Sequence, residues 1–263
     1  MKARSVASRA IWLGLAVLLA ISLSRLGLLD AARLGRGLRN LGEFAGSLFP
    51  PDPASLPTLA GAMVETLEIA FVGTFLGSVL ALPLALLASP VLFGRAVTGP
   101  VKLLLAIVRT VPSLFWAIVF VVAVGLGPAA GALAVALYSL GYLGKLLYET
   151  FDAVDPEVIE AIRGAGAGRM QLARYAILPE AANGIVAQVL FMFEYNVRAS
   201  SIMGFVGAGG IGYYLLGYIQ LLRYDLLLTA LLVTLVVVIA IDRVSALIRR
   251  VYLFPATPPA PAD

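Results

Sequence analysis

The chain has 263 residues, of which 61% are hydrophobic and only 13% are charged. Soluble domains are about half apolar and about a quarter charged, so this composition excludes an ordinary soluble protein and predicts an integral membrane protein. Histidine and cysteine are both absent, which excludes disulfides, thiolate or imidazole chemistry and the usual zinc sites. The net charge of +4 does not indicate nucleic-acid binding, because the basic residues are spread among loops, where they act as topology signals.

The first 58 residues are predicted to form one transmembrane helix followed by an extracytoplasmic linker. The apolar run at 10–23 is as short as the core of a signal peptide, but no clear small-x-small cleavage site follows it, so we expect the helix to be retained. A polar stretch at 30–58 then carries Arg33, Arg36 and Arg39 ahead of a group of prolines. This pattern predicts a short surface helix and then an extended linker.

A transmembrane domain is predicted at 59–252, because apolar segments follow one another there, each close to the length of about 20 residues that crosses a bilayer. We expect these segments at 61–88, 101–124, 129–148, 184–205 and 226–248. Gly73 and Gly77 form a GxxxG pair, where two helices can approach closely. With the first helix, the fold class is all-α and polytopic, with about six transmembrane helices. A proline-rich tail is expected at 253–263.

The orientation follows from the basic residues. An even number of spans puts both termini on one side, and most Lys and Arg residues then lie on that side together with the long loop at 150–183. The positive-inside tendency makes this side the cytoplasm. The arginines of the 30–58 stretch are the exception to this tendency.

The loop at 150–183 is the most polar long loop of the chain. Asp155, Pro156 and Glu157 indicate a helix start, since Asp caps free N–H groups, Pro suits the first helical position and an acid favours the positive end of the helix dipole. Glycines then interrupt the helix, and a second helix is expected from 169 to 178, ended by a proline. The first helix has one apolar face, formed by Val158, Ile159 and Ile162. An elbow with such a face predicts a docking surface for a soluble partner.

This segment, EAIRGAGAGRMQLARYAILP, resembles the EAA loop of ABC-importer permeases, whose pattern is Glu-Ala-Ala, three residues, Gly, nine residues and then Ile-x-Leu-Pro. The positions that match in register are Glu160, Ala161, Gly166, Leu178 and Pro179. Ile162 replaces the second Ala, and Ala176 stands at the position of the Ile. The resemblance implies the type I importer fold and a loop that docks into a groove of a separate ATP-hydrolysing subunit. The alternative is an ordinary solvated loop that joins two spans.

A glycine cluster near the C-terminus spells GxGxxG at Gly207, Gly209 and Gly212. A dinucleotide site would need a preceding soluble strand and an acid about 20 residues further on. A predicted span precedes this cluster instead, while Asp225 is too near and Asp242 too far. We therefore expect no nucleotide site, no cofactor and no enzymatic activity in this chain, and we interpret the cluster as gate or hinge glycines, namely Gly207, Gly209, Gly210 and Gly212.

Charged residues inside predicted spans are candidates for a substrate path, because charges at that depth are costly and face a partner or a polar cavity. Glu194 and Arg198 are four residues apart with the acid first, which predicts an ion pair on one helix face, and Ser201 shares that face. Asn196 and Ser200 form a second polar stripe nearly opposite. The sequence does not decide which stripe faces the path, nor whether the ion pair is structural.

Arg109, Glu65 and Glu68 are further charged residues in the predicted spans. Arg109 belongs either to the path or to an anchor near the membrane interface. Glu65 and Glu68 are expected at an exposed helix start. The candidate substrate path therefore consists of Arg198, Glu194, Ser201 and Arg109.

The run EYNVRASSIMGFVGAGGIG, from Glu194 to Gly212, resembles the corresponding region of phosphonate-importer permeases, as do 109–112 with Trp116 and 141–145. The resemblance implies a bacterial inner-membrane complex of two permeases, forming a homodimer, with ATPase subunits and an extracytoplasmic binding protein. The expected substrate is a phosphonate or a related oxyanion, such as phosphite or a phosphate ester, which a guanidinium is well suited to bind. Methionine permeases share a related glycine-rich segment, so another small solute is the alternative, as is a gradient-driven secondary transporter.

Overall fold

The computed structural model describes residues 2–253, with side chains described for 11–251. All regular structure in this part of the chain is helical, as predicted. Of the predicted proline-rich tail, residues 254–263 lie outside the described part. The longer helices are α1 (Lys2–Arg25), α2 (Ala31–Ser47), α3 (Leu56–Ala88), α4 (Arg95–Thr110), α5 (Ser113–Val124), α6 (Pro128–Asp152), α7 (Pro156–Gly164), α9 (Leu178–Met203), α10 (Ile211–Gln220) and α11 (Tyr224–Ile248). The short ones are η1 (Pro53–Ser55), α8 (Arg169–Leu172), η2 (Ala173–Ile177), η3 (Gly204–Val206) and η4 (Arg249–Leu253).

The chain divides into two units, Met1–Pro51 and Asp52–Asp263. The first unit contains α1, whose stretch Ile11–Arg25 is an apolar helix, and α2. The Asp30 carboxylate caps α2 by accepting a hydrogen bond of 3.0 Å from the Arg33 N–H. The short helix predicted within the 30–58 stretch is therefore present.

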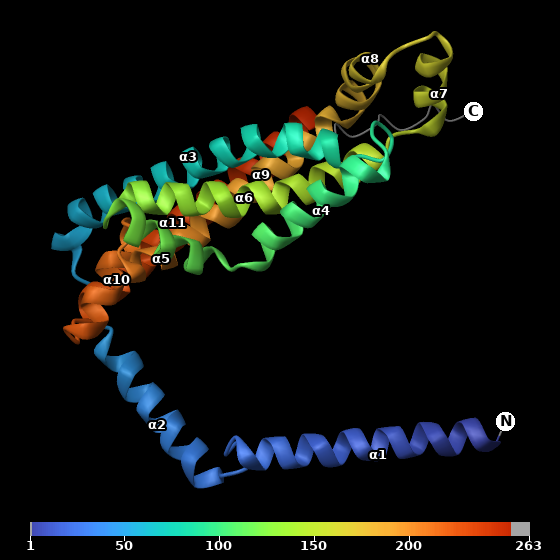
Figure 1. Ribbon diagram of the computed structural model, residues 1–263. Helices are drawn as coiled ribbons and strands as arrows, with labels where there is room; N and C mark the ends of the chain where they lie inside the picture. Colours follow the sequence, from blue (N-terminus) through green and yellow to red (C-terminus); the bar gives the residue numbers. More distant parts are fainter. Residues whose placement is uncertain (1, 254–263) are drawn as a thin grey trace, which may run out of the picture. The chain divides into compact units, whose positions relative to one another are not determined.

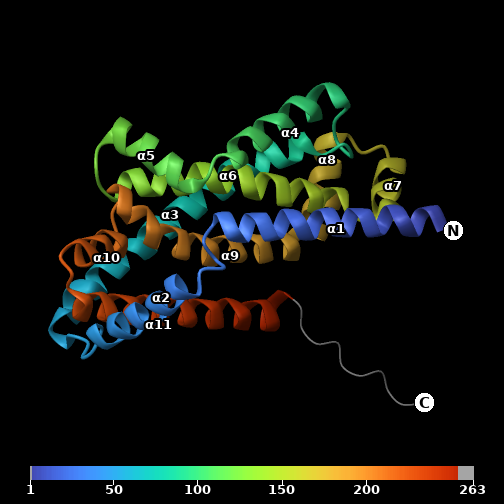
Figure 2. The same ribbon diagram turned by 90° about the horizontal axis from the view of Figure 1, so that it is seen from below.

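The second unit contains the helices that are long and apolar enough to cross a membrane. Within the described residues these are the segments Pro53–Ala88, Pro128–Asp152, Arg169–Val206 and Tyr224–Val251, and the bent pair α4 and α5 makes a fifth if it is counted as one span. With α1 they agree with the prediction of about six. Within this unit, α3, α6, α9 and α11 run lengthwise, with α7 and α8 at one end and α10 at the other (Figures 1 and 2).

The centre of the bundle is the contact between α3 and α6, the most extensive helix pair in the described part of the chain. A Cβ atom on Gly73 would lie 2.5 Å from the Val135 Cβ, and one on Gly77 would lie 2.5 Å from the Ser139 Cβ. Neither site has room for a side chain, so the two helices touch along their backbones. The close approach predicted from the GxxxG pair is confirmed.

The segment predicted at 101–124 is present as two helices with a sharp bend between them. Helix α4 ends at Thr110, α5 begins at Ser113, and their axes differ by 86°. Pro112 causes the break, because its ring disfavours helical geometry at the preceding residue, and Val111 is accordingly extended, with φ −81° and ψ 120°. The Trp116 indole N–H donates to the Val108 carbonyl at 3.3 Å and so bridges the bend.

The prediction that Pro179 ends a short second helix of the loop is also wrong. Helix α8, the π-helical turn η2 and helix α9 follow one another without interruption, and Arg169–Val206 counts as one segment of 38 residues. Pro179 lies in the first turn of α9, where a missing N–H is tolerated, and the wider π-helical turn just before it accommodates the ring. The second arm of the loop is therefore an extension of the membrane helix itself.

Candidate functional site

Residues 155–179 form the elbow predicted for the long loop. The Asp155 carboxylate accepts a hydrogen bond of 2.9 Å from the Glu157 N–H, which confirms the predicted helix start. At the second arm the Gln171 side-chain oxygen accepts one of 2.8 Å from the Gly168 N–H. Between the arms Gly166 has φ +84°, which glycine adopts at little cost, and a Cβ there would meet nothing within 4 Å. The elbow therefore needs glycine for its backbone angle.

The inner face of the elbow packs on the permease bundle. Ile159 and Leu172 are buried in the same apolar cluster as Phe151 at the end of α6. The Arg163 guanidinium donates to the Val91 carbonyl at 3.2 Å and ties α7 to the turn after α3. The expectation that the apolar face of α7 awaits a soluble partner is wrong, because this chain covers it.

The outer face of the elbow carries the positions that match the EAA pattern. Glu160, Ala161, Gly166 and Pro179 are exposed and Leu178 is half-buried. Met170, on the neighbouring helix α8, is 79% exposed. Beside it lies an apolar hollow of about 350 Å³ between α8, the end of α3 and the following turn, lined by Pro83, Leu86, Leu87, Phe93, Met170 and others. The surface open to a partner is thus the motif face together with an apolar rim.

Glu194 and Arg198 of α9 pair with residues of α11 and of η4, which follows it, and not with each other. The Arg249 guanidinium lies 2.7 Å from a Glu194 carboxylate oxygen, and the Arg198 guanidinium donates to Asp242 at 3.0 Å. The predicted Glu194–Arg198 pair is therefore wrong. The earlier residue Glu194 pairs with the later residue Arg249, and the later residue Arg198 pairs with the earlier residue Asp242, as in antiparallel neighbours. The partners of both charges therefore come from the facing segment and not from α9 itself.

The two pairs differ in their access to solvent or substrate. Glu194 is only 8% exposed, whereas the side chains of Arg198 and Asp242 are each 45% exposed. Ser201 is buried, and its hydroxyl donates to the Val197 carbonyl one turn earlier at 3.1 Å. Of the predicted stripe, Arg198 is thus the residue with an accessible charged group.

The second polar stripe of α9 faces α3 and α6. The buried Asn196 amide donates to the Thr74 hydroxyl of α3 and the Ser139 hydroxyl of α6, both at 2.8 Å. Ser200 is buried on the same side. Since a buried amide with both N–H groups bonded holds its neighbours firmly, Asn196 fastens the three central helices together.

Arg109 belongs to a different contact. It lies in the last turn of α4, and a Cβ added to Gly141 of α6 would be 2.8 Å from its backbone nitrogen. Its side chain is half-buried, and within the described part of the chain its guanidinium has no hydrogen-bond or ion-pair partner. Arg109 therefore presents a free cation beside the bend between α4 and α5.

Residues 204–212 form a glycine junction between α9 and α10. Gly207, Gly209 and Gly210 have positive φ angles of 83°, 83° and 74°. The Gly207 carbonyl accepts from the Gly127 N–H at 2.8 Å, which ties the junction to the turn before α6. Gly212 is packed against Gly204, so that a Cβ there would come within 3.0 Å of its backbone. The dense backbone packing explains the glycines without a nucleotide.

The start of α10 is capped by residues of α3. The Glu65 carboxylate accepts a hydrogen bond of 3.1 Å from the Gly210 N–H, and the Thr66 hydroxyl accepts one of 2.8 Å from the Ile211 N–H. The prediction that Glu65 belongs to an exposed helix start is wrong, whereas Glu68 is exposed as expected. Glu65 was missed because its partner is 145 residues away and nothing near it in the sequence indicates a cap.

A helical bundle with a broken span, an elbow at one end and a glycine junction at the other defines the membrane-embedded subunit of an importer. The chain belongs to the family of binding-protein-dependent transport system inner membrane components, whose sequence profile matches residues 73–252. Subunits of this family are not enzymes. They work in the inner membrane with a separate ATPase and a substrate-binding protein.

Individual relatives agree with this assignment. The chain is 37% identical to the phosphite transport system permease protein PtxC of Stutzerimonas stutzeri over 85% of this chain and 82% of that one. It is 38% identical to the phosphate-import permease protein PhnE of Mycolicibacterium smegmatis over 77% of this chain and 38% of that one. Among solved structures, the inward-facing methionine ABC transporter MetNI has a TM-score of 0.68 at 27% identity and covers 76% of this chain and 98% of its own. The predicted importer fold is confirmed.

Proposed function

We propose that the chain is the permease subunit of an ATP-driven importer for phosphite, phosphonate or a closely related oxyanion. The observation that carries this proposal is the 37% identity to a phosphite permease over 85% of the chain. The structural likeness to a methionine transporter concerns the fold, and its identity of 27% is lower. The exposed guanidinium of Arg198 and the half-buried Arg109 support an anionic substrate, because guanidinium groups bind phosphorus oxyanions through several parallel hydrogen bonds.

The elbow is the proposed docking site for the ATPase. Its exposed motif positions, Glu160, Ala161, Gly166 and Pro179, lie on the face that the bundle leaves open, and Leu178 lies at the edge of that face. Because the second arm continues into α9, a displacement of the elbow moves a single segment of 38 residues. That segment carries Arg198, so motion at the elbow is transmitted to the proposed substrate path.

The substrate path is proposed to use Arg198 and Arg109 as anion-binding groups. In the resting state Asp242 neutralises Arg198, and a passing oxyanion competes with that carboxylate for the guanidinium N–H groups. The pair between the buried Glu194 and Arg249 of η4 holds α9 to the end of the segment Tyr224–Val251, and the Ser201 hydroxyl bonds within α9.

The remaining parts of the proposal concern motion and assembly. The glycine junction, with Gly207, Gly209, Gly210 and Gly212, acts as the gate or hinge, since only glycine allows its backbone angles and close contacts. Two copies of this chain form the membrane part of the importer, as the sequence resemblance implies.

Uptake by the purified complex tests the substrate class. The permease, reconstituted with its ATPase and binding protein, should take up labelled phosphite or methylphosphonate in an ATP-dependent manner, and an ionophore that removes ion gradients should leave uptake unchanged. Labelled methionine should not enter. Uptake of methionine, or uptake that follows the ion gradient without ATP, would contradict the proposal.

Charge-neutralising variants test the role of Arg198. Arg198→Gln should abolish most uptake while the complex still assembles and retains basal ATP hydrolysis, and Asp242→Asn should keep uptake. The double variant should behave like Arg198→Gln if the arginine binds substrate. Removal of both charges leaves neither charge stranded, so uptake restored in the double variant would make Arg198 a structural residue.

A further inference from the structure

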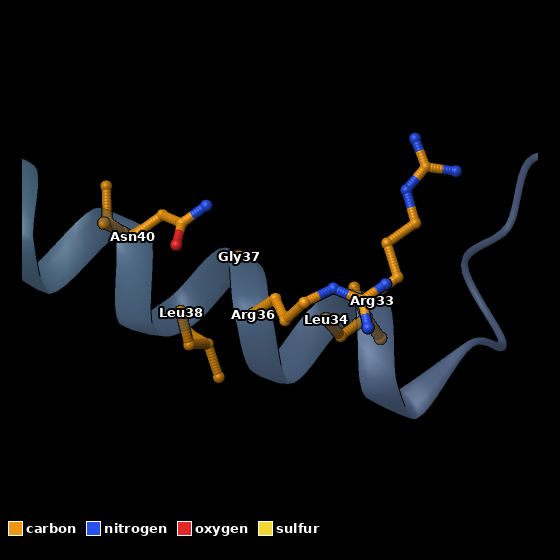
Figure 3. Close-up of a pocket in the computed structure, with 7 residues that line it drawn as sticks. Arg33, Leu34, Arg36, Gly37, Leu38 and Asn40 are labelled. Carbon is orange, nitrogen blue, oxygen red and sulfur yellow. The ribbon is translucent and has the colours of Figure 1, made fainter.

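Helix α2 has two sharply different faces. At 100° per residue, Leu34, Leu38 and Leu41 fall on one side, and Arg33, Arg36, Arg39 and Asn40 fall on the other. Figure 3 shows Leu38 pointing away from the side that carries Asn40 and the Arg33 guanidinium. An apolar strip opposite a basic face is the pattern of a helix that lies in the plane of a membrane surface.

The apolar face of α2 is not buried against the described part of its own unit. Leu34, Leu38 and Leu41 are 48%, 72% and 61% exposed, and no residue of α2 is buried. Such a strip needs an apolar neighbour, because exposed leucines at helical spacing gain free energy when they leave water.

Chain connectivity keeps α2 at the bilayer. Five residues, 26–30, separate it from the apolar helix that ends at Arg25, and five more, 48–52, separate it from the span that begins at Pro53. Five residues reach at most about 18 Å, so neither end of α2 can move far from a helix that needs the membrane. The connecting residues 48–52 are fixed at their C-terminal end, since the Asp52 N–H donates to the Thr229 hydroxyl of α11 at 2.9 Å.

We propose that α2 is an interfacial helix whose leucines enter the bilayer surface and whose arginines contact anionic lipid headgroups. These arginines are also the residues that break the positive-inside pattern of the chain. A role in holding acidic lipids explains their presence. Glu43 is the one acid on the helix, so the polar face carries a net positive charge.

Lipid fits this face better than a protein partner. The apolar strip is narrow, because glycines at 35, 37 and 42 flank it and offer no side chain to a protein pocket. Long arginine side chains reach from the flanks of such a helix to the headgroup layer. Electrostatic attraction to an anionic surface contributes about fivefold to the partition constant for each arginine.

Spin labelling of the whole chain tests the proposal, because the protein contains no cysteine. Single cysteines at positions 34, 36, 38, 40 and 41 are labelled in full-length permease in nanodiscs with a third of the lipid as phosphatidylglycerol. Collision rates with oxygen and with a water-soluble nickel chelate then report depth. Val72→Cys on α3 gives the lipid standard, and Met170→Cys gives the water standard.

The expected result is an alternation with helical period. Labels at 34, 38 and 41 collide mainly with oxygen, and labels at 36 and 40 collide mainly with nickel. Exchange to pure phosphatidylcholine, or Arg33→Gln with Arg36→Gln and Arg39→Gln, should shift the apolar labels toward water, whereas Glu43→Gln should not.

Other outcomes would overturn the proposal. Water-like collision rates at all positions would make α2 a solvated linker. Low rates with both reagents at 34, 38 and 41 would mean that a protein, such as a second copy or the binding protein, covers the face. An alternation that does not depend on lipid charge would remove the role of the arginines.

Discussion

The two ends of the Asp52–Asp263 unit use glycine in different ways. At the elbow, Gly166 has φ +84° and open space around its missing side chain. At the glycine junction, Gly210 also has a positive φ, but a Cβ there would lie 2.5 Å from the Thr66 hydroxyl, and one on Gly209 would lie 2.6 Å from Glu65. At the elbow, glycine is required only for its backbone angle, and the site stays open to a partner. At the junction, glycine is required both for its backbone angle and because neighbouring residues of this chain leave no room for a side chain.

The same difference appears in the hydrogen bonds that hold each end. The elbow is capped by its own residues, Asp155 and Gln171, two and three positions from the N–H groups that they accept. The junction is capped by Glu65 and Thr66 of α3, 145 residues away. The hydrogen bonds of the elbow lie within its own segment, which suits a docking surface. The hydrogen bonds of the junction come from α3 and so couple this helix to α10.

The largest expected difference between the two ends is the side of the membrane on which they lie. Gly168→Cys at the elbow should be shielded from impermeant thiol reagents in intact cells, and Ala54→Cys in η1, just before α3, should be labelled. Both residues are exposed, so access depends on the membrane alone. The reverse pattern would contradict the predicted orientation, and labelling at both positions would mean that an even number of crossings, and not the predicted three, separates them.

Gly210→Ala should strongly destabilise the junction. With φ 74° and ψ −169°, Gly210 lies in a backbone region that essentially only glycine adopts, which costs another residue about 1–3 kcal/mol, and the collision with Thr66 adds about 1–3 kcal/mol. Thermal unfolding in detergent measures the sum. Gly217→Ala in the same helix is the matched control, because its Cβ would meet nothing within 4 Å, and alanine there should be neutral or stabilising by up to about 1 kcal/mol. Equal stability of the two variants would refute the packed junction.

Substitutions at Gly166 should separate backbone strain from partner contact. In the permease alone, Gly166→Ala and Gly166→Leu should cost the same, about 1–2 kcal/mol, because space is open around the site. In the complex, Gly166→Leu should reduce ATPase copurification and substrate-stimulated hydrolysis further than Gly166→Ala. Gly164→Ala serves as the control with an ordinary backbone angle. Identical behaviour of Ala and Leu in the complex would mean that no partner packs there.

The smallest expected effect concerns the cap on α10. Glu65→Ala should lower the free energy of unfolding by about 1 kcal/mol, since one N–H group at the start of the helix loses its acceptor. Glu68→Ala, one turn further along α3 and exposed, should change stability by less than about 0.5 kcal/mol. Similar losses in both variants would show that the bond to Gly210 does not matter for stability.

What the sequence predicted well was local. The Asp155 cap, the glycines of the elbow and the Gly73–Gly77 contact each depend on residues a few positions apart, and each is present in the structure. The importer fold followed from the resemblance carried by the spacing of Glu160, Gly166 and Pro179.

What the sequence could not predict depends on contacts between helices. The favourable four-residue spacing suggested a Glu194–Arg198 pair, but Arg198 pairs with Asp242 of α11 and Glu194 pairs with Arg249 of η4. The effects of two prolines were also predicted wrongly. No bend was expected at Pro112, where the two halves of the segment differ in direction by 86°, and a helix end was expected at Pro179, where the helix continues after a π-helical turn. In each case the outcome depends on packing that single-sequence patterns do not contain.

Protection of the elbow by the ATPase tests the central claim most directly. Met170→Cys at the elbow and Leu221→Cys near the end of α10 are both highly exposed, and no native cysteine interferes. In nanodiscs, adding the ATPase should slow thiol labelling at position 170 at least tenfold and leave the rate at position 221 unchanged. Equal labelling at position 170 with and without bound ATPase would contradict the assignment of the elbow as the coupling site.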